Sequence, residues 1–415
     1  MLFVMLAPVL LCGCATGSLQ KARSEFYSGH ADVAAQILDS EDDVSDTDAL
    51  LFYMEKGAIK YSVGDFHGSI KALLRASALM EQQETIRLSQ ETASLVTSDW
   101  IRDYKGEYAE RLWVHTWLML DYLMTNAWDD AMVEARKALK IYDAWPDVFK
   151  RAFFTRAVAA ISFEAAGDID GAYLEYRKLA RLMDDPAPIL PRLYALARFL
   201  GYDDDAARYE KELSGSALRH ADQYGSSAEV IVFITTGRAP VKVARNIVLP
   251  PSIRFSFPAY MDRHTVFYPP AIYSGGHSEG SQTVTTNVAR VLKASLHERM
   301  RKVLVREAAR AAAKEAAVRQ IDDETLRAIA RITLFLLEEA DTRSWQILPA
   351  FFTVAFIPVA QGDAEITLEF KERGRISLPG AAGPGRFRFF AVTGNGRLFS
   401  AADLAGEMGE PNREP

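Results

Sequence analysis

Hydrophobic and polar residues follow a helical period along the first half of the chain, from about Leu19 to Ala221. Five short segments recur there, each with a turn residue followed five positions later by a small residue. The turns begin at Gly29, Gly64, Asn126, Gly167 and Gly201. Two of the spacings, 35 and 34 residues, match the tetratricopeptide (TPR) period of about 34 residues. We therefore predict a TPR-like array of helix pairs over residues 19–221.

One stretch of this half does not fit a repeat. Residues 81–111 predict an extended helix followed by a polar loop, Tyr104–Glu107. We interpret this stretch as an insertion in the array.

The first helix of each TPR-like pair lines the concave face of such an array, and offsets along these helices identify the residues that face it. They are Leu51, Met54, Tyr61, Trp113, Thr116, Leu120, Phe154, Ile161 and Glu164. Aromatic and aliphatic side chains dominate the set, which predicts a groove for a protein partner. Side chains of these types are also common between packed helices, so a core role stays open for each.

The pattern changes after a polar break at residues 215–227 to short runs of β-branched and aromatic residues, which are typical of strands. The predicted strands are Glu229–Thr235, Val241–Leu249, Ile253–Phe257, Thr265–Tyr268, Gln346–Ile357, Glu365–Phe370 and Arg386–Thr393. The run Thr353–Val359 is apolar on both alternating faces, as in a central strand.

Between these strands, Val288–Ile321 and the stretch from Asp323 to about Ala340 predict a helical hairpin packed on an antiparallel sheet. The alanine-rich run Ala308–Val318 could instead form an exposed coiled-coil arm. The expected fold class is thus α followed by α+β. A TPR-like α-helical repeat array (19–221) precedes an antiparallel β-rich domain (228–395) with a helical insert (287–340) and a disordered tail (396–415).

The first residues of the chain predict where in the cell the protein is located. Met1–Leu11 is an uncharged apolar run that ends at Cys12, Gly13 and Cys14. It is too short to span a membrane, which takes about 20 residues, but it suits a signal peptide. A lipobox needs a small residue before the modified cysteine, and Gly13 meets this need for Cys14. The alternative, a buried N-terminal helix, leaves the Cys-Gly-Cys sequence unexplained.

We therefore expect residues 1–14 to form a lipoprotein signal peptide and lipobox, with lipid attached to Cys14. The next residue is Ala15 rather than the aspartate that tends to retain lipoproteins in the inner membrane of enteric bacteria. By that analogy, the predicted location is the periplasmic face of the outer membrane.

Composition and motifs argue against several classes of function. The net charge of −7 gives no support for nucleic-acid binding, and no phosphate-binding glycine motif supports a nucleotide site. The seven histidines are scattered, so we expect no metal. Gly276–Gly280 matches G-x-S-x-G, but only His297 follows it, which does not suit a hydrolase triad. We expect no cofactor and no catalytic residues, although an enzyme with a nonlocal site stays possible.

Asp341, Arg343 and Trp345 form a separate group where the predicted helical insert ends and a strand begins. An Arg–Asp pair beside an indole could hold this corner by a bidentate hydrogen bond and stacking. The same residue types could instead form a binding hot spot. We favour the corner.

Four segments together resemble an uncharacterised family of bacterial TPR-type lipoproteins. They are Tyr53–Gly57, Tyr104–Glu107 with Glu110-Arg111, Ala131–Ala138, and Asp341–Pro349. Members are often encoded beside a lipoprotein that activates a penicillin-binding protein, so the resemblance implies a role in cell-wall or envelope assembly. It implies no catalytic residues.

The leading hypothesis is a lipid-anchored scaffold that binds protein partners of the cell envelope through its repeats. Two alternatives place a site between the two domains. One is an enzyme acting on an envelope polymer, which a cleft joining Glu55, Glu107 and Glu110 would favour. The other is a small-ligand or glycan binder, which a closed aromatic pocket would favour.

Overall fold

The computed structural model describes residues 14–89, 103–213, 229–249, 253–263, 267–274, 277–278, 283–329, 340–358, 366–371, 374–378, 387–394 and 398–400, with a few isolated positions. The predicted signal peptide, residues 1–13, lies outside these ranges. Cys14 is the first residue of helix α1.

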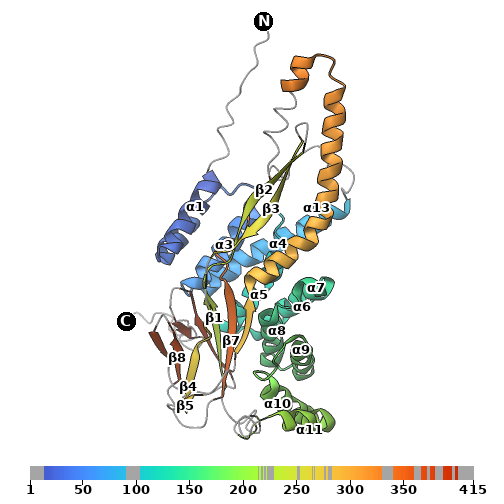
Figure 1. Ribbon diagram of the computed structural model, residues 1–415. Coiled ribbons are helices and arrows are strands. Elements are labelled where there is room, and N and C mark those ends of the chain that lie inside the picture. The colour runs from blue at the N-terminus through green and yellow to red at the C-terminus, as the bar shows by residue number, and fades with distance from the viewer. Residues whose placement is uncertain are drawn as a thin grey trace, which may run out of the picture.

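Among the described residues of the first half, the helices form five pairs (Figure 1). They are α1 (Cys14–Tyr27) with α2 (Ala31–Asp39), α3 (Ala49–Ser62) with α4 (Phe66–Ser89), α5 (Tyr108–Met124) with α6 (Trp128–Ala144), α8 (Phe153–Ala165) with α9 (Ile169–Leu182), and α10 (Leu190–Leu200) with α11 (Asp203–Glu212). A short helix, α7 (Pro146–Phe149), joins α6 to α8. The predicted helical array is confirmed. Of the extended helix predicted from residue 81, residues 81–89 form the end of α4, and residues 90–102 lie outside the described ranges.

The repeat turns are formed by residues with left-handed backbone conformation. Gly29, Gly64, Gly167 and Gly201 have φ between 74° and 92°, and Asn126 has φ of 58°. Glycine adopts this conformation without steric cost, and asparagine tolerates it better than most residues. Gly57 is needed for a different reason, because a Cβ there would lie 2.5 Å from the Leu73 side chain of the paired helix.

A mixed sheet of five strands lies against the helices, in the order β11-β10-β1-β7-β6. Its strands are β1 (Glu229–Thr236), β6 (Thr283–Asn287), β7 (Phe351–Pro358), β10 (Phe387–Val392) and β11 (Leu398–Ser400). The prediction of an antiparallel sheet is wrong in one respect, since β1 and β10 pair in parallel. β11 also lies within the stretch predicted to be a disordered tail.

A second sheet, in the order β5-β4-β8-β9, covers the other face of the first. It contains β4 (Ala271–Ser274), β5 (His277–Ser278), β8 (Ile366–Phe370) and β9 (Gly374–Leu378). The sequence predicted β8 but not β4, β5, β6 or β9. The described residues of the predicted strand Thr265–Tyr268, which are 265, 267 and 268, lie outside any strand.

Strand β7 is central, as its apolar pattern predicted. Phe352, Val354 and Phe356 face the helices, whereas Ala355 and Ile357 face the second sheet. One hydrophobic core therefore runs from α1 through the helical array to β10, and the helices and the first sheet form a single packed unit.

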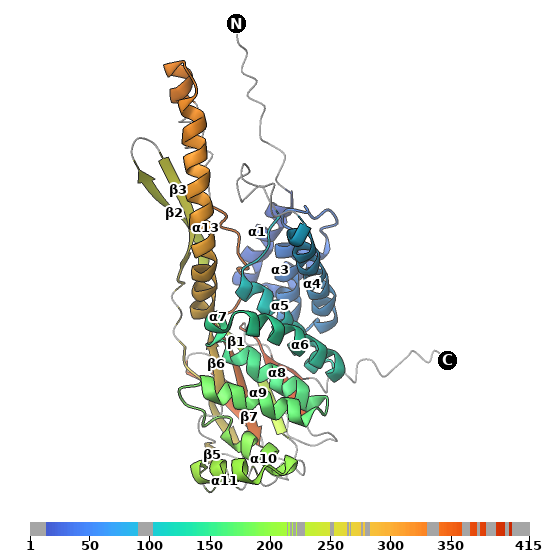
Figure 2. The same ribbon diagram turned by 90° about the vertical axis from the view of Figure 1, so that its right-hand side faces the viewer.

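A long arm projects from this unit (Figures 1 and 2). It consists of the hairpin of β2 (Val241–Leu249) and β3 (Ile253–Met261), the helix α13 (Val288–Arg319) and the helical residues 324–329 beyond it. α13 packs against β3 and, near its start, against α5 and α7. The predicted helical hairpin on the sheet is thus wrong for most of α13, which extends beyond the sheet.

Candidate functional site

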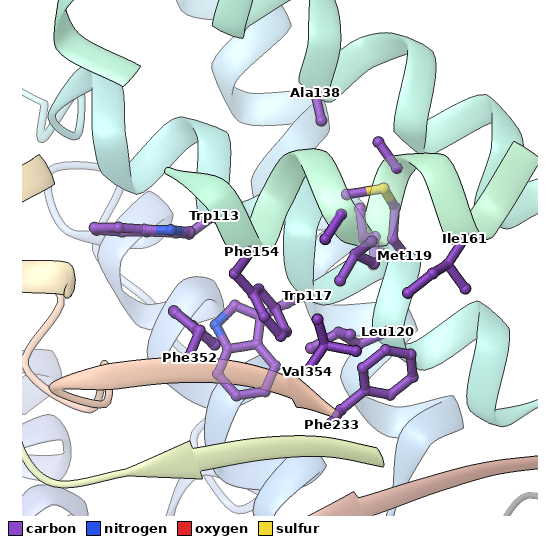
Figure 3. Packing of buried hydrophobic residues seen from close by; sticks show 14 of the residues in the cluster. Trp113, Trp117, Met119, Leu120, Ala138, Phe154, Ile161, Phe233, Phe352 and Val354 are labelled. Atoms are coloured by element: carbon purple, nitrogen blue, oxygen red, sulfur yellow. The ribbon is translucent and has the colours of Figure 1, made fainter. Parts of the chain in front are cut away.

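The concave face of the array is filled by the chain's own sheet (Figure 3). The Phe154 ring stacks on Phe352 of β7 with centroids 5.1 Å apart, and Trp113 lies 6.1 Å from the same ring. All nine predicted groove residues are 3% exposed or less: Leu51, Met54, Tyr61, Trp113, Thr116, Leu120, Phe154, Ile161 and Glu164. The prediction that they form an open groove is wrong, because all nine are buried in the core, where Trp113 and Phe154 pack against β7.

The polar members of this set have partners inside the protein. Thr116 and Thr155 share a hydrogen bond of 2.9 Å between their hydroxyls. Glu164 accepts hydrogen bonds from Arg192 and from the Tyr176 hydroxyl. Arg192 also pairs with Glu229 at the start of β1, so this buried ion network ties the array to the sheet.

The residues 341–349, called the strap below, run between the arm and β7 along helices α1, α3 and α5. Two fully buried carboxylates bind consecutive amides of the strap. The Trp345 N–H donates to Oε1 of Glu110 at 2.8 Å, and the Gln346 N–H donates to Oε1 of Glu55 at 2.7 Å. Carboxylates that accept backbone N–H groups make strong, charge-assisted hydrogen bonds, which fixes the path of the strap.

The strap's carbonyls are bound by three donors from two other elements, α1 and β2. Arg23 of α1 donates to the Ser344 carbonyl at 3.3 Å, and Lys242 of β2 donates to the Arg343 carbonyl at 3.0 Å. The Tyr27 hydroxyl donates to the Gln346 carbonyl. Both the N–H groups and the carbonyls of the strap backbone therefore have partners between Arg343 and Gln346, as buried backbone polar groups generally do.

Glu107 joins the arm to the start of α5. Its Oε1 lies 2.7 Å from Lys242 Nζ and 2.6 Å from an Arg299 guanidinium nitrogen. Burial acts to raise the pKa of the Glu107 carboxyl, but Lys242 and Arg299 outweigh it, so the pKa is lowered. Burial dominates at Glu110, whose pKa is raised. Its other oxygen accepts from the Glu107 N–H at 2.6 Å and from the Tyr104 hydroxyl.

Arg343 holds the corner at the start of the strap. It donates to both carboxylate oxygens of Asp341, at 3.0 and 2.9 Å, and to Asp48 at 2.9 Å. The predicted Arg–Asp pair is confirmed. The stacking partner differs from the prediction: the Arg343 guanidinium lies 5.4 Å from the Tyr104 ring, whereas Trp345 is buried at 1% exposure.

The three carboxylates named in the enzyme hypothesis therefore do converge, but not in a cleft. Glu55, Glu107 and Glu110 have 0% exposure, and backbone amides and cations occupy them. Glu107 and Glu110 are neighbours whose pKa values are shifted in opposite directions, which would suit acid–base catalysis if a substrate could reach them. Because all three carboxylates are buried, they form a structural clamp that holds the strap.

Sequence reasoning missed several members of this clamp. It assigned Tyr104–Glu107 to a polar loop, yet Tyr104 and Glu107 are buried at 2% and 0% exposure. Arg23, Lys242 and Arg299 gave no local signal, because they lie far from their partners in the sequence. The sequence did offer one clue. Three of the segments that carry the family resemblance, those around Glu55, Glu107 and Asp341, all contribute residues to this one site.

The described ranges contain no group of three or more His, Cys, Asp or Glu side chains that could hold a metal ion. No helix in them combines the length and the apolar character that crossing a membrane requires.

No family model and no curated protein matches the chain. Among solved structures, a crystal structure of MamA has a TM-score of 0.34 at 13% identity, over 49% of this chain and 94% of that chain. The aspartyl phosphate phosphatase F from Bacillus subtilis has a TM-score of 0.31 at 12% identity, over 47% and 48% of the two chains. Likenesses of this size assign neither a family nor an activity.

Proposed function

We propose that this chain is a lipid-anchored adaptor on the periplasmic face of the bacterial outer membrane, and that it binds protein partners of the cell envelope through its arm. The proposal rests on the arm because the arm extends away from the packed unit of the helices and the first sheet (Figures 1 and 2). The concave face, where a TPR-like array would hold a partner, is occupied by β-strands of the same chain.

Exposed apolar side chains on the arm support this role. Val248 near the end of β2 is 57% exposed, and Leu326 and Ile329 beyond α13 are 57% and 54% exposed. Large apolar side chains exposed near one another are a common feature of protein interaction sites. A partner that binds the arm would remove the apolar surface of these side chains from water.

The charge of the arm differs from that of the whole chain. The sequence of α13 contains nine lysines and arginines but only three glutamates, Glu298, Glu307 and Glu315. The whole chain has a net charge of −7. A basic arm on an acidic protein would attract an acidic partner surface and speed its association.

The arm also lies toward the proposed anchor. The N-terminal end of α1 points to the same end of the molecule as the arm (Figure 1). A lipid on Cys14 would then hold the arm near the membrane, where a membrane-bound partner could reach it. The resemblance to TPR-type lipoproteins supports a partner involved in cell-wall or envelope assembly.

Site-specific photo-crosslinking in cells tests the arm. A crosslinking residue at Val248 or Leu326 should give a specific protein adduct. Leu174 on α9, which is 42% exposed, provides a matched apolar position away from the arm. Adducts at Leu174 with none at the two arm positions would overturn the proposal.

A further inference from the structure

The hairpin of β2 and β3 carries a regular strand edge along the arm, where it lies beside α13 (Figure 2). All nine residues of β2 pair one to one with residues of β3, so the strand contains no bulge. In the described part of the chain, no further strand pairs with β2. Helix α13 packs against β3, the other strand of the hairpin. The edge of β2 that faces away from β3, called the outer edge below, is therefore an edge of the sheet.

The backbone of β2 directs hydrogen-bonding groups toward this outer edge. Ala244 pairs with Pro258 of β3. Proline cannot donate to a ladder, so it is accommodated where its nitrogen faces away from the neighbouring strand. Pairs with and without ladder hydrogen bonds alternate along antiparallel strands. Ala244 and Val248, which are four positions apart, therefore both direct their N–H and C=O groups away from β3.

The outer edge is open to solvent and weakly protected against pairing. Residues 244–248 are all exposed, with Ile247 at 49% and Val248 at 57%. Successive side chains lie on opposite faces of a strand, so both faces are uncovered here. Sheet edges are commonly protected by proline, bulges or charged side chains. β2 has no proline, and its charged residues are Arg245 and the buried Lys242.

The side chains of β2 indicate which kind of strand would pair with it. Arg245 and Ile247 share one face, and Ala244 and Val248 share the other. Opposite charges and β-branched residues make favourable pairs across neighbouring strands. A segment with an acidic residue opposite Arg245 and a β-branched residue opposite Val248 would therefore match both faces.

The charge of α13 argues against a second copy of this chain as the partner strand. Pairing two β2 strands would place two copies of α13 on one four-stranded sheet. Each copy contains nine lysines and arginines but only three glutamates, so the two helices would repel each other. The same charge would attract an acidic segment of a different protein.

We propose that the outer edge of β2 binds an extended, acidic segment of a partner protein by β-strand addition. Main-chain hydrogen bonds to residues such as Ala244 and Val248 supply the affinity, and the side chains on the two faces supply the specificity. This inference rests on the proposed function, because it assigns a binding mode to the arm.

A synthetic peptide of nine residues, the length of β2, tests the binding mode. Valine alternates in it with glutamate and threonine, so that valine matches Val248 and glutamate matches Arg245. Isothermal titration calorimetry on the full chain in detergent should give a dissociation constant below about 100 μM. An analogue with methylated peptide nitrogens keeps the side chains but cannot donate to β2, so it should bind at least about tenfold more weakly. A peptide with lysine in place of glutamate should also bind more weakly.

Two variants of one residue locate the binding. Val248→Pro removes an N–H from the outer edge but leaves the ladder between β2 and β3 intact, so it should weaken binding of the peptide about tenfold. Val248→Thr keeps the N–H and the β-branched shape, and it should bind like the wild type. Because Val248 is exposed, both variants should fold, which thermal unfolding followed by circular dichroism checks.

Three results would overturn strand addition at β2. They are no binding of the peptide to the wild type at 1 mM, equal binding to the wild type and Val248→Pro, and equal binding of the methylated analogue and the peptide. The last comparison uses only the wild type, so it decides the question even where Val248→Pro fails to fold. A wild-type dimer in light scattering that Val248→Pro dissociates would overturn the proposal in favour of a second copy.

Crosslinking at Leu326 separates this inference from the proposed function. Adducts at Leu326 that are equal in the wild type and in Val248→Pro would keep the arm as the binding surface but contradict strand addition. Adducts that are lost in Val248→Pro and kept in Val248→Thr would support both. Failure of the proposed function itself would appear as adducts at Leu174 with none at the arm positions of the wild type.

Discussion

Buried ionisable residues follow two different patterns in this protein. Glu107 keeps its charge because two cations contact it. Within the described part of the chain, the Asp121 carboxyl of α5 is bound only by the Ser69 hydroxyl, which donates to its Oδ2 at 2.6 Å. Burial raises the pKa of Asp121 well above its usual range, and the hydrogen bond from Ser69 offsets only part of this effect. The two carboxyls should therefore respond to pH in opposite ways.

Asp121→Asn should be at least as stable as the wild type at pH 7. The folded state holds the Asp121 proton, whereas the unfolded chain releases it above about pH 4. The contribution of the Asp121 carboxyl to the free energy of unfolding is therefore fully present below about pH 4. It is lost as the pH rises toward the pKa of the folded state, by up to about 1.4 kcal/mol per pH unit. The advantage of the variant should grow from pH 4 to pH 7 in urea unfolding. A constant difference across this range would contradict the prediction.

Glu107→Gln provides the contrast in the same measurement. Its pKa is lowered in the folded state, so its contribution is present above about pH 4.3 and is lost as pH falls through the folded pKa. Removing one partner of a buried ion pair costs about 3–5 kcal/mol. The variant should lose this amount at pH 7 and much less in acid.

The sequence indicated the corner where the strap begins, but it did not indicate that the strap is held by distant carboxylates. Residues around Asp341 were recognisable as a corner, and the Arg343–Asp341 pair lies close enough in sequence to be predicted. The partners Glu55 and Glu110 are 291 and 235 residues away from the amides they bind. Local patterns carry no information about such distances.

Arg343→Ala should lower the melting temperature by several degrees. The change removes charge-assisted hydrogen bonds to Asp341 and Asp48, which are worth about 1.5–3 kcal/mol in total stability. Arg343→Lys keeps the charge but cannot bind Asp341 through two nitrogens, so it should recover only part of the loss. Thermal unfolding followed by circular dichroism measures both. An unchanged melting temperature with lost partner binding would instead indicate a hot spot.

The helix pairs were predictable because their signals are local. Gly29, Gly64 and Asn126 mark turns by conformational preference, and each second helix begins two residues later. Charged residues in the insertion misled the prediction, since Glu107 and Glu110 belong to a type that is rarely buried without a partner. The parallel pairing of β1 with β10 joins segments more than 150 residues apart, which no periodicity could indicate.

At the scale of the whole molecule, the anchor and the arm should act together. Cys14→Ala should move the protein from the membrane fraction to the soluble fraction after cell lysis, because the lipid would be lost. It should also remove the crosslinks at Val248 and Leu326 if the partner is membrane-bound. Fractionation and immunoblotting measure the first effect. Equal membrane retention of the variant and the wild type would contradict lipid anchoring at Cys14.

The filled concave face also limits how this protein can change in evolution or by design. Open helical solenoids gain and lose repeats easily, since each repeat contacts only its neighbours. Here each helix pair from α1 to α11 belongs to the core that continues into the sheet. Deleting the pair that contains α5 or the pair that contains α8 would expose Phe352 to water, because Trp113, Trp117 and Phe154 cover it. The central repeats are therefore tied to the sheet that they cover.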